Sequence, residues 1–375
     1  MLMTNPFPKH LKTALALFLC LSQTTHAFEE TSWNNSSDTH YSHYNSSNAH
    51  FYEEPCCENQ SNLTISEELI YFKPTREQSS YVITSTSNVV GGEFFPNGTR
   101  HLNSMNYKPG FRVGAVYDPC GDSNALDFRF TYFSAGHSAS TSGDFLFDTI
   151  GFPGDGAQAP EDTFYVGTAS IHDHYKYYAV DATFNRLSLC SLSDSLFLLI
   201  GLHYANIQHN TRFTSVGSFT SSGSSSPVDN TLRSSSKFWG IGPQFGLDYT
   251  YHLPNQCYIN GQFALNANMR AALLCSNSDA SFHYTTLRTA RTAGVNLSND
   301  DLWRVTPTFD ARLGGTYHFC FWGLDANIEL GYEWIWYADS IDSITGIDVA
   351  FAGDSIDLFS NFSLSGPFIK LSVPF

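Results

Sequence analysis

Residues 364–375 read LSGPFIKLSVPF and end the chain. If this stretch is extended, its apolar face carries Ile369, Leu371, Val373 and Phe375. The opposite face then carries Lys370 and Ser372. A two-residue period of this kind is typical of a β-strand with one apolar and one polar face. The stretch therefore predicts a terminal amphipathic strand whose last residue is aromatic.

A final strand with a terminal Phe resembles the assembly signal of bacterial outer-membrane β-barrels. The resemblance implies that Ile369, Leu371, Val373 and Phe375 are recognised by the barrel-assembly machinery, with outer-membrane lipid around the finished protein. It also implies a location in the bacterial outer membrane.

The same alternation recurs along the chain, for example in 237–251 and 302–317. Several of these segments reach the nine to eleven residues that a tilted strand needs to cross a membrane, whereas strands in soluble proteins average five or six. This length favours a membrane barrel over a soluble β-sandwich. The expected strands are 63–72, 108–118, 125–134, 174–187, 195–207, 237–251, 258–271, 302–317, 321–337 and 357–375.

The connections between these strands alternate in length. Short turns are expected at 118–124, 188–194, 252–257 and 318–320. Long loops are expected at 73–107, 135–173, 208–236, 272–301 and 338–356. Short periplasmic turns alternating with long outer loops are typical of outer-membrane barrels. We therefore predict an all-β, antiparallel, up-and-down transmembrane barrel of ten strands, or twelve if segment 81–90 adds a hairpin, with both termini in the periplasm.

Aromatic residues should form two girdles at the ends of this barrel. Those next to the long loops are Tyr132, Trp239, Trp303, Trp334 and Trp336, and those at the other end are Tyr249, Tyr251 and Phe375. The alternative, that aromatic residues simply favour strands, predicts no clustering at strand ends.

The N-terminal region predicts export. Lys9 and Lys12 precede the apolar run 14–21, and Ala27 follows a short polar stretch, as in a secretory signal peptide. A lipoprotein anchor at Cys20 is disfavoured because Phe18 and Leu19 stand where small residues are required. We expect a signal peptide at 1–27, a Ser/Asn/His-rich periplasmic segment at 28–62 and the barrel at 63–375.

Composition excludes some classes of partner. The chain has 19 Lys and Arg against 35 Asp and Glu, a net charge of −16. Nucleic-acid binding needs clustered positive charge, so no nucleic-acid partner is expected. A pore lined by such a chain would weakly prefer cations.

Six cysteines would lie on the periplasmic side of the predicted barrel. They are Cys56, Cys57, Cys120, Cys190, Cys257 and Cys320. Disulfides persist in the oxidising periplasm. However, cysteines spread around a rim can lie too far apart to pair within one chain. Two interpretations remain open: disulfide bonds to other copies or to cysteine-rich periplasmic proteins, and locally paired or unpaired thiols.

Several blocks resemble the Legionella-type pore-forming major outer-membrane proteins, which have relatives among chlamydia-like bacteria. The blocks are Ser66–Phe72, Gly110–Gly114, Leu126–Phe128, Phe238–Pro243 and Gly331–Trp334. The resemblance covers most of 63–375, and Trp239-Gly240-Ile241-Gly242-Pro243 is its most specific part. It implies a porin-like barrel for small hydrophilic solutes, in an envelope reinforced by disulfides. The loops and segment 28–62 depart from the family.

Charged residues on the inward face of the strands are the candidate functional residues. The pore-lining candidates are Arg112, Asp127, Arg129, Asp248, Arg304, Asp310, Arg312, Asp325, Glu329, Glu333 and Lys370. Facing charges can orient permeating solutes. Alternatively they form salt bridges that fill a narrow interior, since small barrels are packed with side chains.

His172-Asp173-His174 could be part of a metal or surface protease site, but a convincing site needs further partners. No nucleophile motif is present. We therefore expect no catalytic residues, no metal and no cofactor. The first functional hypothesis is a passive channel. The alternative is a closed structural or adhesive surface protein whose outer loops bind ligands.

Overall fold

The structure is a computed structural model. It describes residues 63–76, 80–85, 98–118, 125–150, 165–190, 194–221, 224–253, 261–288, 291–321, 324–348 and 354–375. The predicted signal peptide 1–27 and segment 28–62 lie outside the described residues. Within these ranges, no helix has the length and apolar character needed to cross a membrane.

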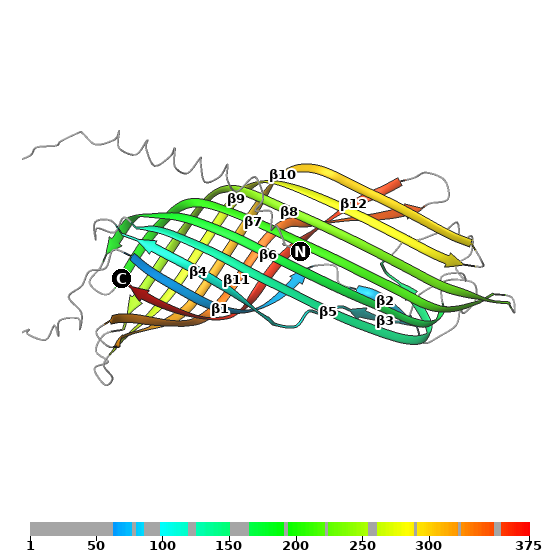
Figure 1. The fold of residues 1–375 in the computed structure, drawn as a ribbon, viewed down its shortest axis with the longest axis horizontal. Coiled ribbons are helices and arrows are strands. Elements are labelled where there is room, and N and C mark those ends of the chain that lie inside the picture. Colours follow the sequence, from blue (N-terminus) through cyan, green and yellow to red (C-terminus); the bar gives the residue numbers. More distant parts are fainter. Residues whose placement is uncertain are drawn as a thin grey trace, which may run out of the picture. The chain divides into compact units, whose positions relative to one another are not determined.

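The described chain is all antiparallel β-structure (Figure 1). The strands are β1 (Leu63–Arg76), β2 (Ser80–Ser85), β3 (Gly98–Leu102), β4 (Lys108–Tyr117), β5 (Leu126–Asp148), β6 (Tyr165–Cys190), β7 (Asp194–Ser221), β8 (Ser224–His252), β9 (Gly261–Arg288), β10 (Arg291–Phe321), β11 (Leu324–Asp348) and β12 (Asp354–Pro374). The ten predicted strands correspond to β1 and β4–β12. The possible extra hairpin is present as β2 and β3.

The ten long strands close into a barrel. Their order is β5-β4-β1-β12-β11-β10-β9-β8-β7-β6, and β6 pairs with β5 to complete the ring. Strand β1 pairs with β12 in the register Thr64↔Pro374, and the Phe375 amide donates a hydrogen bond to the Leu63 carbonyl over 2.7 Å. The first and last strands therefore begin and end at the same rim, which we call the terminal rim.

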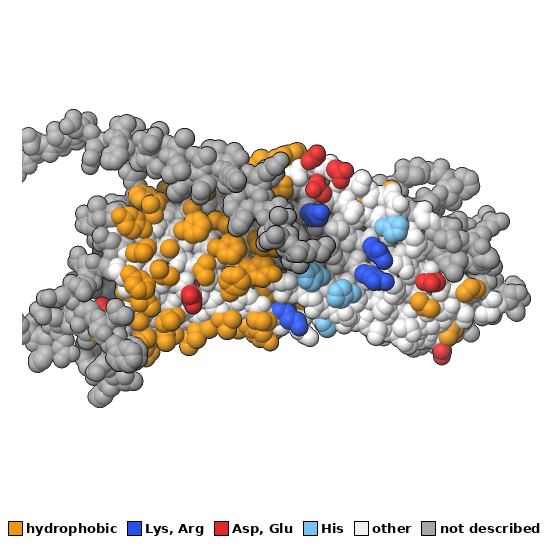
Figure 2. All heavy atoms as spheres, viewed as in Figure 1, with side chains coloured by type: hydrophobic (Ala, Val, Ile, Leu, Met, Phe, Trp, Pro, Cys, Tyr) orange, Lys and Arg blue, Asp and Glu red, His pale blue; other side chains and the backbone are white. Residues whose placement is uncertain are grey.

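Alternation along the strands separates an apolar outer face from a polar inner face. On β10, the outward Val305 and Leu313 are 69% and 66% exposed, whereas Thr306 between them in the sequence is 1% exposed. Figure 2 shows apolar side chains gathered over one half of the barrel face in view. This band is the surface expected of a barrel wall in contact with lipid.

One predicted girdle is a row of aromatic residues across the strands. Tyr132 is paired with Tyr178, and their ring centroids are 5.2 Å apart. Trp239 contacts Trp303 edge-on, with centroids 5.5 Å apart. These four residues, the aromatic row, mark the edge of the apolar band that lies away from the terminal rim.

The strands run far beyond the aromatic row, so part of the loop prediction was wrong. Residues 208–221 and 224–236, predicted as a loop, belong to β7 and β8 and pair continuously from Gln208↔Lys237 to Ser221↔Ser224. Residues of the predicted loops 135–173, 272–301 and 338–356 likewise extend β5, β6, β9, β10, β11 and β12. Their outward face is rich in Ser and Thr, so the contrast that marks an amphipathic strand is weak there.

We call β2, β3 and the parts of β5–β12 beyond the aromatic row the head. Its interior contains an apolar core, in which Leu146, Phe213 and Leu232 are at most 1% exposed. The polarity of the two faces therefore inverts along each strand. Within the apolar band the charges lie inside the barrel, and in the head the hydrophobic core lies inside.

Candidate functional site in the barrel interior

The interior at the depth of the apolar band is built around Arg112 of β4. Its cross-strand partners are Glu68 on β1 and Thr131 on β5, so the three side chains point inward at one level. Arg112 Nη1 donates to Glu68 Oε1 over 2.7 Å, and Nε donates to Thr131 Oγ1 over 2.8 Å. The side chains of Arg112 and Glu68 are each 3% exposed. Neighbouring strands thus supply charge and countercharge together.

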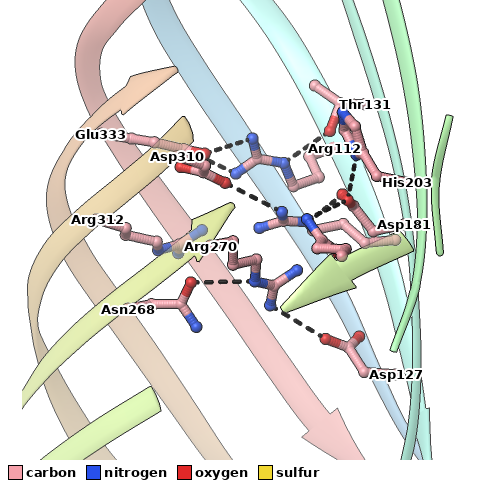
Figure 3. A network of polar contacts seen from close by, with 12 residues as sticks. Arg112, Asp127, Thr131, Asp181, His203, Asn268, Arg270, Asp310, Arg312 and Glu333 are labelled. Atoms are coloured by element: carbon pink, nitrogen blue, oxygen red, sulfur yellow. Dashed lines mark hydrogen bonds and ion pairs between the residues drawn. The ribbon is translucent and has the colours of Figure 1, made fainter. Parts of the chain in front are cut away.

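A further ion pair joins Arg112 to Glu333 on β11, a strand that is not its neighbour (Figure 3). Both Glu333 oxygens on β11 accept hydrogen bonds from Arg112, over 2.7 and 2.8 Å. Arg312 on β10 donates to the other Glu68 oxygen over 2.8 Å and to Glu329 over 3.1 Å. Bidentate guanidinium–carboxylate pairs are strong and geometrically specific. The pairs therefore cross-link β1, β4, β10 and β11 through the interior.

Other contacts span the full width of the barrel. Strand β10 is the fifth neighbour of β5 in either direction around the ring, and Arg129 on β5 reaches Asp310 on β10 over 3.3 Å. Arg270 on β9 lies 3.5 Å from Asp127 on β5. Opposite walls are thus in direct contact at this depth.

A layer of aromatic and polar groups continues this closure toward the head. The hydroxyl groups of Tyr177 on β6 and Tyr337 on β11, which are also opposite strands, are 2.8 Å apart. His203 Nε2 lies 2.8 Å from the same Tyr337 hydroxyl, and His203 Nδ1 lies 2.6 Å from Asp181. Phe133 and Phe238 pack in the same core and are fully buried.

Little space remains between these groups. A cavity of about 10 Å³ lies between the charged layer and the tyrosines, lined by Arg129, Asp310 and Tyr337 among others. That volume accommodates about one water molecule. Three polar atoms among its lining residues, Asp310 Oδ1, Gln244 Oε1 and Arg270 Nη1, have no hydrogen-bond partner within the protein. The cavity is therefore a polar pocket for water rather than a passage for a solute.

The predicted pore-lining residues share this interior. Ion pairs hold Arg112, Asp127, Arg129, Arg304, Asp310, Arg312, Glu329, Glu333 and Lys370. Asp248 lies on the face of β8 that carries the buried Gln244, and Asp325 lies on the face of β11 that carries Glu329. The candidates are thus brought together, mostly as mutual partners.

Several interior residues were missed by the sequence analysis. Arg270 continues the inward face of the predicted strand 258–271, two residues after Asn268, and could have been found by extending the alternation. Asp181 and His203 lie on strands whose inward face is otherwise largely apolar, so polarity gave no signal for them. Glu68 was noticed only as part of a family-like block.

His172, Asp173 and His174 do not converge on one site. Asp173 points into the head, where its carboxylate accepts hydrogen bonds from Asn103 over 2.6 Å and Thr211 over 2.5 Å, while both histidines lie on the outer face. Burial raises the pKa of Asp173, but the hydrogen bond and charge of His209 outweigh it and hold that pKa below its ordinary value. Across the described ranges, no cluster of three His, Cys, Asp or Glu residues suits a metal ion.

The cysteine predictions fall largely outside the described side chains. This applies to Cys56, Cys57, Cys120, Cys190 and Cys257. The structure describes Cys320, which lies near the C-terminal end of β10. The exposed Cys275 is a free thiol on the outer face of β9.

Comparison with known proteins gives one family match and several similar folds. The family model described as the Legionella pneumophila major outer membrane protein precursor matches residues 53–375. No curated protein sequence matches the chain.

Among solved structures, the outer membrane protease OmpT from Escherichia coli is 10% identical, with a TM-score of 0.41 over 84% of this chain and 97% of that one. The P. putida toluene transporter TodX is 7% identical, with a TM-score of 0.29 over 86% and 93%. A Pseudomonas aeruginosa FadL homologue is 9% identical, with a TM-score of 0.26 over the same shares.

Proposed function

Because the chain belongs to the Legionella major outer membrane protein family, we propose that it is an outer-membrane barrel with a closed interior that carries a rigid β-structured head beyond the bilayer. The observation that supports closure is the direct contact between opposite walls, Arg129 with Asp310 and Tyr177 with Tyr337. In this proposal the barrel is an anchor, and the head is its working part.

The proposed orientation places the terminal rim in the periplasm and the head at the cell surface. The predicted signal peptide and the recognition of the last strand by the assembly machinery both require this direction. The residues that would be recognised, Ile369, Leu371 and Phe375, are 43%, 45% and 63% exposed on the outer wall. A head built from strands up to 31 residues long then reaches well outside the bilayer.

The role that suits this architecture is structural or adhesive rather than enzymatic. The head has its own buried core and buried hydrogen bonds such as that between Asn103 and Asp173. It can therefore present a rigid surface to the outside of the cell. His172 and Asp173 point to opposite faces of β6, so they do not form a shared catalytic site.

A passive channel for small hydrophilic solutes is the second candidate. The observation that favours it is the charged layer itself, because Arg112, Arg129 and Arg312 with their acids would line a polar path if the cross-barrel contacts opened. A buried ion-paired core costs desolvation energy. A barrel that conducts no solute has less reason to keep such an ion-paired core.

Planar-bilayer conductance of the refolded protein separates the two candidates. The closed barrel predicts no steady current from the wild type at neutral pH. The variant Tyr177→Ala/Tyr337→Ala/Arg129→Ala/Asp310→Ala removes both contacts between opposite walls and is the opened form used for comparison. A steady ohmic current from the wild type, equal to that of the opened form, would establish the channel instead. Heat-modifiable gel migration verifies that both proteins are folded.

Disulfide linkage through the terminal rim is a further part of the proposal. Cys320 lies near this rim, as do the ends of the strands that flank the turns after Tyr117, Cys190 and His252. Non-reducing gels of isolated envelopes should show species larger than a monomer that disappear with reductant. Migration as a monomer without reductant would contradict the linkage.

A further inference from the structure

A row of basic and histidine residues crosses the outer surface of the head. The register pairs His172 with Arg212, Arg212 with Arg233 and Arg233 with His283, on four consecutive strands. All four side chains are exposed. Figure 2 shows Lys, Arg and His side chains together on this face, beside the apolar band. We call these four residues the basic row.

The two arginines of the basic row repel each other. Like charges directly opposite one another on neighbouring strands destabilise a sheet. Among the residues that the structure describes, neither Arg212 nor Arg233 has an acidic partner. The flanking His172 contacts the neutral Ser138 hydroxyl over 2.8 Å. In a chain of net charge −16, an unneutralised pair of guanidinium groups indicates a place for an external anion.

The position of the basic row relative to the aromatic row indicates which anion this is. Asn206, the register partner of Trp239, is six residues from Arg212 on β7. Six residues of strand span about 20 Å, and a strand tilt of about 40° reduces the height to about 15 Å. The polar zone of a phospholipid leaflet is about 6 Å thick. The basic row therefore lies above phospholipid headgroups, while Lys176, two residues from Tyr178, lies within their range.

We propose that the basic row, with Lys176 below it, binds the phosphate groups of a phosphorylated glycolipid packed against the barrel wall. A glycolipid keeps its acyl chains on the apolar band, and its sugar headgroup carries negative charge up to the height of Arg212 and Arg233. Guanidinium groups bind phosphate oxygens in a bidentate manner. The position of Lys176 between the apolar band and the basic row favours a lipid over a soluble polyanion.

The structure also limits the extent of this surface. Lys237, on the next strand from Gln208, is the register partner of Asp279 on β9, so an acidic side chain stands beside it. Below the basic row, at the level of Lys237, the basic surface is therefore bounded by β9. This inference goes beyond the proposed function and requires only that the head lies on the glycolipid side of the membrane.

The test is lipid binding to the refolded full chain, measured by native mass spectrometry in detergent. The probes are lipopolysaccharide with phosphorylated core sugars, phosphatidylglycerol and heparin, a soluble polyanion. The wild type should bind this lipopolysaccharide in preference to the other two, and Arg212→Gln/Arg233→Gln should bind it at least about tenfold more weakly. The matched control is Arg100→Gln, because Arg100 is an exposed head arginine outside the basic row. It should bind as the wild type does.

Three results would overturn the inference. Unchanged lipopolysaccharide binding in the double variant removes the arginines from any site. Equal binding of phosphatidylglycerol reduces the effect to general surface charge, and tighter binding of heparin assigns the surface to a soluble polyanion. Gel migration of the folded form controls for misfolding. A conducting barrel in the bilayer experiment would leave this inference untouched, so the two proposals fail separately.

Discussion

Glu67 and Glu68 are neighbours in the sequence, but the structure predicts opposite effects on stability when each is replaced by Gln. Glu68 is buried, and its two oxygens accept hydrogen bonds from Arg112 over 2.7 Å and Arg312 over 2.8 Å. Glu67 is exposed on the outer wall, in register with Leu371 and Val113. We therefore predict that Glu68→Gln destabilises the barrel and that Glu67→Gln does not.

The magnitude follows from the contacts. Removing one partner of a buried ion pair costs about 3–5 kcal/mol. In Glu68→Gln, the Gln oxygen can still accept a hydrogen bond from one arginine. Its amide group, however, points two donor hydrogens at the second arginine. We therefore expect a loss of about 3 kcal/mol in the free energy of unfolding. A charge on the lipid face is itself unfavourable, and acids cost less there than the roughly 2–4 kcal/mol of basic residues. Glu67→Gln should then stabilise the barrel by about 1 kcal/mol or leave it unchanged.

Urea unfolding of both variants in lipid vesicles, followed by tryptophan fluorescence, measures the two free energies. Because the substitution is identical and the positions are adjacent, differences in strand propensity and assembly largely cancel. Equal shifts for the two variants would refute the assignment of faces in β1. A loss of less than about 0.5 kcal/mol for Glu68→Gln would show that the ion pairs do not support the barrel.

Two further predictions concern the head and the membrane level. Burial raises the pKa of Asp148 despite hydrogen bonds from Tyr165 and Ser215, so the folded head holds this proton more tightly than the unfolded chain. The stabilisation from protonated Asp148 is complete below the ordinary carboxyl pKa and is lost as pH rises through the raised pKa. Hydrogen exchange of the head should therefore become faster over that pH range in the wild type and not in Asp148→Asn. Cys275 lies on the outer wall within the apolar band, opposite Val305, so in vesicles it should resist a membrane-impermeant maleimide that modifies the head variant Val216→Cys. Peptide mapping gives both labelling yields. Rapid labelling of Cys275 would contradict its placement within the apolar band.

The sequence was sufficient to predict the barrel and the inward face of its membrane-level strands. A strand has a period of two, so one apolar neighbour on each side is enough to assign Asp310 or Glu333 to the interior. The strand lengths and the terminal Phe375 then decided between a membrane barrel and a sandwich. Both arguments use local sequence, which a single chain contains in full.

The closure of the interior and the head could not be predicted in the same way. Whether Arg129 meets Asp310 depends on which strands lie opposite, and that depends on the stagger of the closed ring rather than on any one strand. The head strands could not be recognised from the sequence because their outward face is made of small polar residues, which are also common in loops. Asp181 escaped because it shares its inward face with Tyr177, on a strand whose interior side is already largely apolar.

The ion pairs have a consequence for strand register that does not depend on how much they stabilise. A slip of one residue would turn every inward side chain of a strand outward. For β4 and β10, that slip would place Arg112 and Arg312 in lipid, at about 2–4 kcal/mol each near the midplane, and would leave Glu333 buried without its partner. An apolar interior would carry no such penalty, because its side chains are as acceptable to lipid as to the core. The charged layer therefore discriminates against shifted pairings at the depth where the outer face must be apolar. Beyond the aromatic row water covers the outer face, so an apolar interior is enough to hold the register there.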